Sequence, residues 1–190
     1  MILPNENHHM VDLETLDTSA TAIVLSIGLA SFSLDKGITD RADLVLRIDD
    51  QEEVGRTRSD ATVAWWADQS PEARKVLDDA ENCNKDTHET LTMLGDWLGP
   101  VPILWGNGAA FDNAILQNLY ESFNIEPPWK HWHNRCYRTL KDLGEKKIAR
   151  LRGEYIIEPE PSRRGTHHNA MDDATYQAEC ALRYLKALAL

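Results

Sequence analysis

The chain has 190 residues, of which 42% are hydrophobic and 27% charged, a composition typical of one soluble globular domain, here expected over residues 1–190. It has no apolar run of the roughly 18–20 residues that a membrane helix requires and no leader peptide pattern, so we expect a cytoplasmic protein without membrane contact. The net charge of −11 excludes a protein that coats nucleic acid through a uniformly basic surface, and three dispersed cysteines exclude a disulfide framework and a CxxC zinc site.

The first fifty residues are predicted to form strands. Short stretches of apolar and β-branched residues predict strands at 9–13, 21–32 and 43–48. Turns that contain Asp and Gly separate these stretches, so we expect an antiparallel meander.

Helical patterns dominate the following segment. Helices are predicted over 59–68, from Ser70-Pro71-Glu72 onward, and over 86–98. Serine is a preferred helix cap and proline fits the first helical position, which makes residues 70–72 a clear helix start. Gly99-Pro100 ends the third helix.

The second half of the chain alternates a strand with helices. We expect a strand at 101–105, a helix over 111–123, a loop or short turn at 127–135, a short helix from 139–143, a mobile loop at 146–166 and a helix over 170–188. The last helix carries a core stripe of Ala174, Ala181, Tyr184 and Leu188. Strands followed by alternating helices and a further strand predict an α/β domain with a mixed sheet.

Asp12 and Glu14 stand two residues apart on the first predicted strand. Residues i and i+2 of a strand point to the same face, so both carboxylates project together while Val11 and Leu13 point into the core. Like charges at this spacing repel unless a cation lies between them, which favours a metal site. The alternative is a strand end with two solvated acids.

Asp112 follows a Gly-rich turn, Trp105 to Phe111, at the start of a predicted helix. An acid in the first turn of a helix is common for structural reasons alone. The small residues Gly106, Gly108, Ala109 and Ala110 leave room for a substrate backbone to approach. On this segment by itself, the structural interpretation of Asp112 is favoured.

A third motif runs from His167 to Asp173, where a His-bearing loop enters the last helix. His168 lies five residues before Asp173, so both can face one cleft. Asp172 is rotated by about 100° from Asp173 on a helix and is expected to be an ordinary first-turn acid. His167 is the rival of His168, with an exposed loop histidine as its alternative role.

Together these residues form the order DxE, D and HxxxxD. Oxygen ligands select hard ions such as Mg²⁺ or Mn²⁺, and two such ions about 4 Å apart can activate water and stabilise the leaving oxygen of a phosphodiester. A neutral imidazole close by can take the proton from the attacking water. The predicted metal ligands are therefore Asp12, Glu14, Asp112 and Asp173, and His168 is the predicted general base.

These three motifs resemble those of the DEDDh exonuclease superfamily, which includes RNase T and the proofreading exonuclease subunits. The resemblance implies an RNase H-like fold: a central five-stranded mixed sheet with the first three strands antiparallel, flanked by helices. It also implies 3′→5′ hydrolysis of nucleic acid to nucleoside 5′-monophosphates. Many superfamily members carry an acid where this chain has Ser26 before Ile27-Gly28, a position that is not a metal ligand in the family.

A narrower resemblance covers almost the whole chain. The stretches TVAWWADQSPEAR at 62–74, WGNGAAFDNAIL at 105–116 and PPWKHWHNRCYRTL at 127–140 are similar to phage DexA-type exonucleases and to the mycobacterial-type exoribonuclease that prefers adenylate tracts. If the protein is phage-encoded, the expected location is the host cytoplasm. Some related enzymes are homodimers, and Trp129 and Trp132, expected to be exposed, are candidate interface residues.

Two adjacent tryptophans and a glutamine are candidate contacts to a base. Trp65 and Trp66 lie on one predicted helix, so one can pack in the core while the other stacks on a base, an interaction that contributes roughly 1–3 kcal/mol. Gln69 either binds a base edge or is an exposed residue at a helix end.

Further candidates surround Asp112 and the predicted loop. Arg138 is the strongest candidate for a phosphate contact, with a surface salt bridge as its alternative. Asn107 and Phe111 flank Asp112, and Phe111 either wedges against the terminal base or packs in the core. Arg163 and Arg164 precede His168 and either bind the nucleic-acid backbone or solubilise the loop.

The leading hypothesis is a 3′→5′ exonuclease that uses two Mg²⁺ or Mn²⁺ ions on single-stranded DNA or RNA. A second hypothesis keeps this site but assigns RNA tails or nucleotide caps as substrates. A third, from another class, is an inactive module that binds a nucleic-acid 3′ end or a partner protein. The five intact positions of the site count against the third hypothesis.

Overall fold

The computed structural model describes residues 7–151 and 155–190 of the chain. Its strands are β1 (His8–Thr15), β2 (Val24–Ser33), β3 (Gly37–Val45), β4 (Ile103–Gly106) and β5 (Asn134–Cys136). They form one sheet in the order β3-β2-β1-β4-β5. The pairs β1–β2 and β2–β3 are antiparallel, whereas β4 pairs in parallel with both β1 and β5. The sheet is therefore mixed, and β1 is its central strand.

Seven α-helices and one short 3-10 helix accompany the sheet within the described residues. They are α1 (Ile48–Glu53), α2 (Asp60–Ala67), α3 (Pro71–Glu81), α4 (Thr87–Leu98), α5 (Asp112–Ser122), η1 (His131–His133), α6 (Tyr137–Leu151) and α7 (Ala170–Ala189). Ser59 and Ser70 accept hydrogen bonds from the backbone N–H groups three residues further on. These contacts are N-caps, and the one at Ser70 confirms the predicted start of α3.

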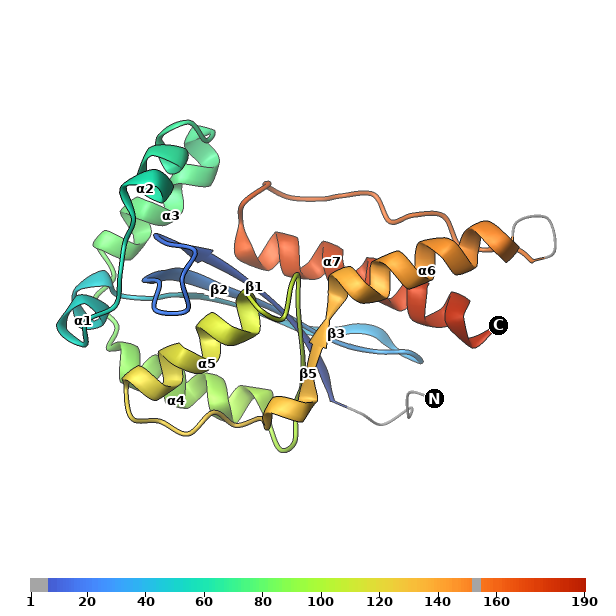
Figure 1. Ribbon diagram of the computed structural model, residues 1–190, viewed down its shortest axis with the longest axis horizontal. Coiled ribbons are helices and arrows are strands. Elements are labelled where there is room, and N and C mark those ends of the chain that lie inside the picture. The colour runs from blue at the N-terminus through green and yellow to red at the C-terminus, as the bar shows by residue number, and fades with distance from the viewer. Residues whose placement is uncertain (1–6, 152–154) are drawn as a thin grey trace.

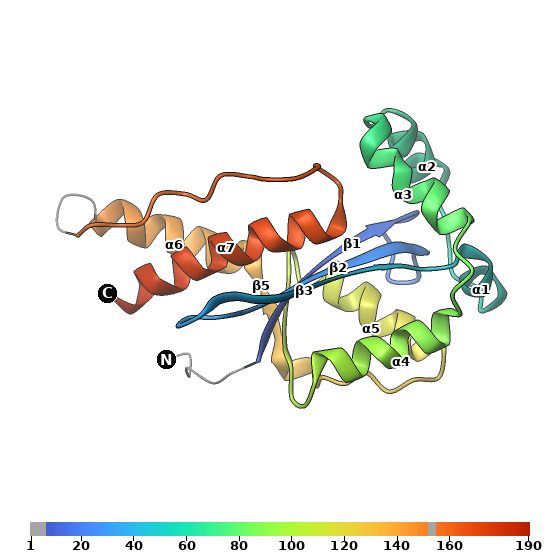
Figure 2. The same ribbon diagram turned by 180° about the vertical axis from the view of Figure 1, so that it is seen from behind.

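The helices lie on both faces of the sheet and at one end of it. Helices α6 and α7 cover one face, α4 and α5 cover the other, and α1 to α3 gather at one end (Figures 1 and 2). No helix among the described residues is long and apolar enough to cross a membrane.

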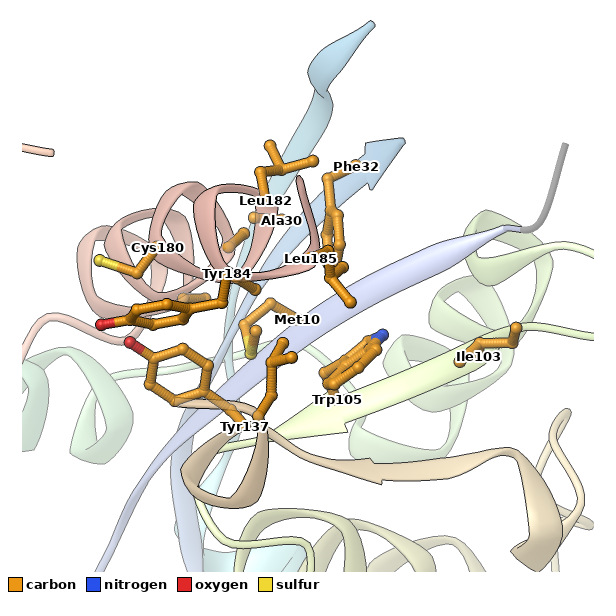
Figure 3. Close-up of a cluster of buried hydrophobic side chains, with 14 of the residues drawn as sticks. Met10, Ala30, Phe32, Ile103, Trp105, Tyr137, Cys180, Leu182, Tyr184 and Leu185 are labelled. Atoms are coloured by element: carbon orange, nitrogen blue, oxygen red, sulfur yellow. The ribbon is translucent and has the colours of Figure 1, made fainter. Parts of the chain in front are cut away.

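The core beneath α6 and α7 joins residues that are far apart in sequence. Met10 and Trp105 from two strands pack with Tyr137 of α6 and with Tyr184 and Leu185 of α7 (Figure 3). Met10 lies on the same side of β1 as residues 12 and 14, so this cluster faces the same helices as the predicted acids. The α7 stripe is confirmed at positions 174, 181 and 184, but Leu188, in the last turn of the helix, is exposed.

The opposite face holds the second core cluster. Val11 and Leu13 pack here with Leu91, Leu94 and Leu98 of α4 and with apolar residues of α5. The predicted alternation of β1 is thus confirmed. Because the apolar residues of this core lie on one side of β1, the other side can carry polar groups near the end of the strand.

The third strand lies earlier than predicted. We expected residues 43–48, but β3 spans Gly37–Val45, and α1 begins at Ile48. Among the described strands, β3 is at the edge of the sheet and pairs only with β2, so residues 39–41 are exposed and polar. That exposure removes the apolar alternation by which a strand is recognised in sequence.

Helix α6 is much longer than the predicted short helix at 139–143. It continues to Leu151, so the prediction of a loop is wrong over 146–151. Leu140, Ile148 and Leu151 are buried in the structure, which stabilises a segment whose many charges mask its helical pattern. Residues 152–154 of the predicted loop lie outside the described residues, and 156–169 form neither helix nor strand.

The segment predicted as a loop or short turn at 127–135 contains η1 and the start of β5. A strand of three residues has too few positions to show a pattern, and parallel pairing with β4 defines it. Trp129, expected to be exposed, is buried and packs edge-on against Tyr120 with ring centroids 5.5 Å apart. Trp132 is exposed as expected, and the homodimer stays a prediction.

Candidate active site

A cavity of about 490 Å³ opens on the α7 side of the sheet, between β1 and the starts of α5, α6 and α7. All five residues predicted for catalysis line it: Asp12, Glu14, Asp112, His168 and Asp173. Three separate segments of the chain supply them, and only the folded sheet brings these segments together. The three sequence motifs therefore belong to one site in space.

The central strand supplies the first two acids. Asp12 and Glu14 project from β1 on the side of Met10, while Leu13 points to the opposite core cluster. Glu14 is only 6% exposed. A buried carboxylate needs a partner of opposite charge or several hydrogen bonds, which makes this pair costly in the absence of a cation.

Gly28 allows α7 to approach the first acid closely. Gly28 is the cross-strand partner of Asp12, and a Cβ atom at this position would lie 1.9 Å from the carbonyl carbon of Ala170. The first turn of α7 therefore rests directly on the sheet. As a result, ligand oxygens of Asp12, Glu14 and Asp173 all lie within 4.8 Å of one another.

Gly106 has the same role for α5. A Cβ atom there would lie 2.2 Å from Asn113 Oδ1 and 2.9 Å from Asp112 Cβ. The room left by Gly106, which we expected a substrate backbone to use, is filled by the start of α5. Asn113 Nδ2 donates to the Leu104 carbonyl at 2.9 Å, which anchors the helix start to β4. This anchoring places Asp112 in the cavity, where it is 3% exposed.

Burial and mutual repulsion disfavour the ionised forms of these acids. Burial raises the pKa of Glu14 to about 8, with a further contribution from the charges of Asp173 and Asp112. Burial also raises the pKa of Asp112 to about 7, against the effect of backbone hydrogen bonds. Burial, followed by the charges of Asp112 and Glu14, raises the pKa of Asp12 well above its usual range. Cations in the cavity would reverse these shifts.

The donor set fits divalent metal ions. Three carboxylates present oxygens close enough to share an ion, and Asp112 Oδ2 is buried without a hydrogen-bond partner among the described residues. Carboxylate oxygens suit Mg²⁺ and Mn²⁺. Arg163, in the loop before α7, also lines the cavity and donates to Asp173 Oδ1. One cationic side chain of the protein therefore contacts one of the acids.

His168 stands at the edge of the same group. Its backbone N–H donates to Asp173 Oδ2 at 3.3 Å, and its ring meets Trp65 edge to face with centroids 4.9 Å apart. Burial, and then the neighbouring His167, lower the pKa of His168, so its ring is neutral at pH 7 and able to accept a proton. His167, the alternative candidate for the general base, also lines the cavity. The centroid of its ring lies 4.0 Å from that of the His168 ring.

The two tryptophans of α2 have different surroundings. Trp66 is 1% exposed and its indole N–H donates to the Thr15 carbonyl at 2.9 Å, so Trp66 takes the core alternative. Trp65 is 42% exposed beside His168. Gln69 Nε2 donates to the Trp65 carbonyl at 2.9 Å. None of the three is among the residues that line the cavity, although Trp65 borders it through His168.

The remaining predicted substrate residues do line the cavity. Arg138 Nε donates to Asn107 Oδ1 at 3.3 Å, and Phe111 packs partly against the α4–α5 core while it faces the cavity. Arg138 is exposed, and Lys141 lines the same wall of α6. Two cationic side chains of α6 therefore line the same cavity as the acids, in a protein of net charge −11.

Gln177, like Lys141, is a site residue that sequence analysis missed. It lines the cavity, and its Nε2 donates to Asp12 Oδ1 at 2.7 Å. It lies four residues after Asp173, a spacing that places both on one face of a helix. That spacing is the signal by which it can be found, but glutamine on a helix has no chemical signature by itself.

Comparison with known proteins shows the family to which the chain belongs. Residues 7–185 match the model of a family described as the 3′-5′ exoribonuclease Rv2179c-like domain. An exodeoxyribonuclease of Enterobacteria phage T4 is 24% identical over 157 residues, which cover 68% of each chain.

Solved structures with the same fold are nucleases. The nuclease domain of 3′hExo, a DEDDh family member bound to rAMP, matches with a TM-score of 0.62 at 14% identity, covering 95% of this chain and 92% of that one. E. coli Exonuclease I in complex with a dA16 oligonucleotide gives 0.63 at 16% identity, covering 96% of this chain and 41% of that one. The predicted RNase H-like fold, a mixed five-stranded sheet flanked by helices, is thereby confirmed.

Proposed function

The chain belongs to the family of Rv2179c-like 3′-5′ exoribonuclease domains, and on this basis we propose that it is a two-metal-ion 3′→5′ exonuclease of single-stranded nucleic acid. In this proposal one domain, residues 1–190, carries the whole site. The ions are Mg²⁺ or Mn²⁺, held by Asp12, Glu14, Asp112 and Asp173.

A single observation carries the proposal: buried acids from three segments converge without enough positive charge. Asp12, Glu14 and Asp173 present oxygens within 4.8 Å of one another, and Asp112 adds an unpartnered buried oxygen to the same cavity. A fold maintained for stability alone would gain by replacing such acids with apolar residues. Their presence is explained if the cavity binds cations.

Divalent ions at this site supply the activation of water and the stabilisation of charge on the leaving oxygen. The protein supplies the base and the positioning. The neutral imidazole of His168 takes the proton as the water oxygen bonds to the terminal phosphorus. The bond from phosphorus to the 3′ oxygen of the preceding nucleotide breaks, and a nucleoside 5′-monophosphate leaves. Arg138 and Lys141 contact the phosphates that remain.

The proposed substrate is a single strand of DNA or RNA. The family description names RNA, the phage relative is an exodeoxyribonuclease, and the structural relatives bind rAMP and dA16. Trimming of RNA tails or nucleotide caps by the same site is the alternative, which a comparison of homopolymers and capped RNA at one salt concentration separates. An inactive binding module would bind these strands and release nothing.

The test is mononucleotide release from a 3′-end-labelled single strand with Mn²⁺ or Mg²⁺. We expect wild type to be active, a chelator to abolish activity, and Asp112→Asn to lower kcat by roughly 10²–10³-fold, as when one electrostatic stabiliser of a transition state is lost. Asp78→Asn, an exposed change on α3, is the matched control and keeps wild-type activity. Equal activity of Asp112→Asn and wild type contradicts the proposal.

A further inference from the structure

The side chain of Gln177 reaches from α7 to the central strand and contacts the first acid of the site. Gln177 Nε2 donates to Asp12 Oδ1 at 2.7 Å, and Gln177 is 7% exposed. The ionised form of Asp12, which binds an ion, only accepts hydrogen bonds, and the amide NH₂ group that faces it suits this form. This is the one hydrogen bond to the Asp12 side chain among the described residues.

We propose that Gln177 is a positioning residue that fixes the Asp12 carboxylate for divalent-ion binding. The inference rests on the proposed function, since it concerns how the same site binds its ions. A hydrogen-bonded ligand loses less rotational freedom when it binds an ion than a free one does. Donors that orient metal ligands in this way commonly change metal affinity by about 10–100-fold when they are removed.

The position of Gln177 on the helix suits this role. It follows Asp173 by four residues, so the two residues share one face of α7. That face therefore carries the proposed ligand Asp173 and the amide that orients Asp12. Asp12 lies on β1 and Asp173 on α7. The Gln177 contact therefore links the two elements whose separation determines how far apart their carboxylates lie.

A role in stability alone does not explain the amide. The other end of Gln177, Oε1, is buried and has no hydrogen-bond partner among the described residues. Leaving such a group unsatisfied costs a free energy of the same order as the one that a hydrogen bond to a charged group contributes. These two effects nearly cancel. An apolar side chain would hold α7 on the sheet as well, as Ala174, Ala178 and Ala181 already do.

The Asp12 carboxylate can accept the hydrogen bond from Gln177 and still bind a divalent ion. Its two oxygens offer about four lone-pair positions, and the contact with Gln177 occupies one of them. About three positions remain for an ion, and one Asp12 oxygen lies within 4.8 Å of oxygens of Glu14 and Asp173. The hydrogen bond thus constrains Asp12 without competing for its metal-binding positions.

The experiment compares Mn²⁺ binding by isothermal titration calorimetry in metal-free wild type and Gln177→Met. Methionine keeps the length and volume of the side chain and removes the amide. We expect Mn²⁺ to bind about 10–100-fold more weakly to the variant. We also expect the activity of the variant to recover as Mn²⁺ is raised, which activity lost through misfolding does not do.

Gln117→Met is the matched control. Gln117 also lies on a helix and donates to a carboxylate, Glu121 Oε1, at 2.9 Å, but at the surface and away from the cavity. Its variant should bind Mn²⁺ as wild type does. If Gln177→Met does not fold, Gln177→Asn, which is one methylene too short to reach Asp12, is measured in the same way.

The outcomes separate this inference from the proposed function. Unchanged Mn²⁺ affinity in the folded Gln177 variant overturns the positioning role and leaves the exonuclease proposal intact. Wild type that binds no Mn²⁺ and releases no nucleotide overturns both. Weaker binding in the variant, with wild-type affinity in Gln117→Met, supports the positioning role.

Discussion

His168 adopts a left-handed backbone conformation, with a φ angle of 64°, immediately before the helix that carries Asp173. This region costs a residue with a side chain about 1–2 kcal/mol, so the surrounding contacts must hold it. The backbone N–H donates to Asp173 Oδ2 and the ring lies against Trp65. The strained backbone thus places the imidazole at the acids, as a general base requires.

Two variants, one at each histidine, test the proposal that His168 is the general base. His168→Ala should lower kcat by about 10²–10⁴-fold, the usual contribution of a general base, while calorimetry still detects Mn²⁺ binding. His167→Ala should change kcat by far less. The reverse pattern would show that His167 is the base, and loss of Mn²⁺ binding in His168→Ala would show that the ring is a ligand.

At the scale of elements, two glycines determine how closely the helices approach the sheet. Gly28 is opposite Asp12 and lets α7 begin on the surface of the sheet, and Gly106 does the same for α5. A pair of adjacent tryptophans attaches α2 in a different way. Trp66 is anchored in the core by its bond to the Thr15 carbonyl, and this anchor presents Trp65 at the surface next to His168.

Because Trp66 is buried and Trp65 is exposed beside His168, substitutions of the two tryptophans should have different effects. Trp65→Ala should raise KM for a single strand by roughly 5- to 150-fold, which corresponds to the 1–3 kcal/mol of base stacking, and leave the melting temperature near that of wild type. Trp66→Ala should destabilise the fold by about 3–5 kcal/mol through the cavity it leaves.

Steady-state kinetics and thermal melting distinguish these effects. Trp65→Phe should retain part of the stacking and give an intermediate KM. A fall in kcat at unchanged KM in Trp65→Ala would instead mean that Trp65 acts by holding the His168 ring.

At the scale of the whole molecule, stability depends on buried ionisable groups at both ends of β1. Glu14 lies at the end of the strand that enters the cavity, and His9 lies near the other end, 2% exposed. His9 Nε2 contacts the Leu98 carbonyl at 3.1 Å, and the Ser31 hydroxyl contacts Nδ1 at 2.9 Å. Because a carbonyl only accepts, Nε2 carries the proton and Nδ1 accepts from Ser31. The neutral ring is therefore fully hydrogen-bonded.

The buried His9 predicts a loss of stability in mild acid. Burial lowers the pKa of His9 to about 4, below its value of 6.5 in the unfolded chain. The unfolded state then binds the proton first, so the contribution of His9 is complete above pH 6.5 and falls as the pH drops toward 4. The full loss is about 3 kcal/mol. Urea unfolding of wild type and His9→Gln at pH 7 and pH 5 measures the part of this loss that falls between those two pH values, about 2 kcal/mol. Identical pH dependence in both proteins contradicts the prediction.

The sequence alone predicted which residues gather at the candidate site and where most of the elements lie. The alternation of β1, the caps of α2 and α3 and the order of the acids depend on local spacing, which the chain carries in its own residues. The five predicted catalytic residues do line one cavity, although their roles stay predictions. Local physical rules suffice wherever a residue's role depends on neighbours within a few positions.

Only the tertiary structure decided the features that depend on distant partners. Strand β5 exists through its pairing with β4, the end of α6 through burial, and the contact of Gln177 with Asp12 spans 165 positions in the chain. Which tryptophan is buried was likewise settled by the Thr15 carbonyl, 51 residues away. Such contacts leave no periodic pattern in sequence, because they form only when the sheet brings remote segments together.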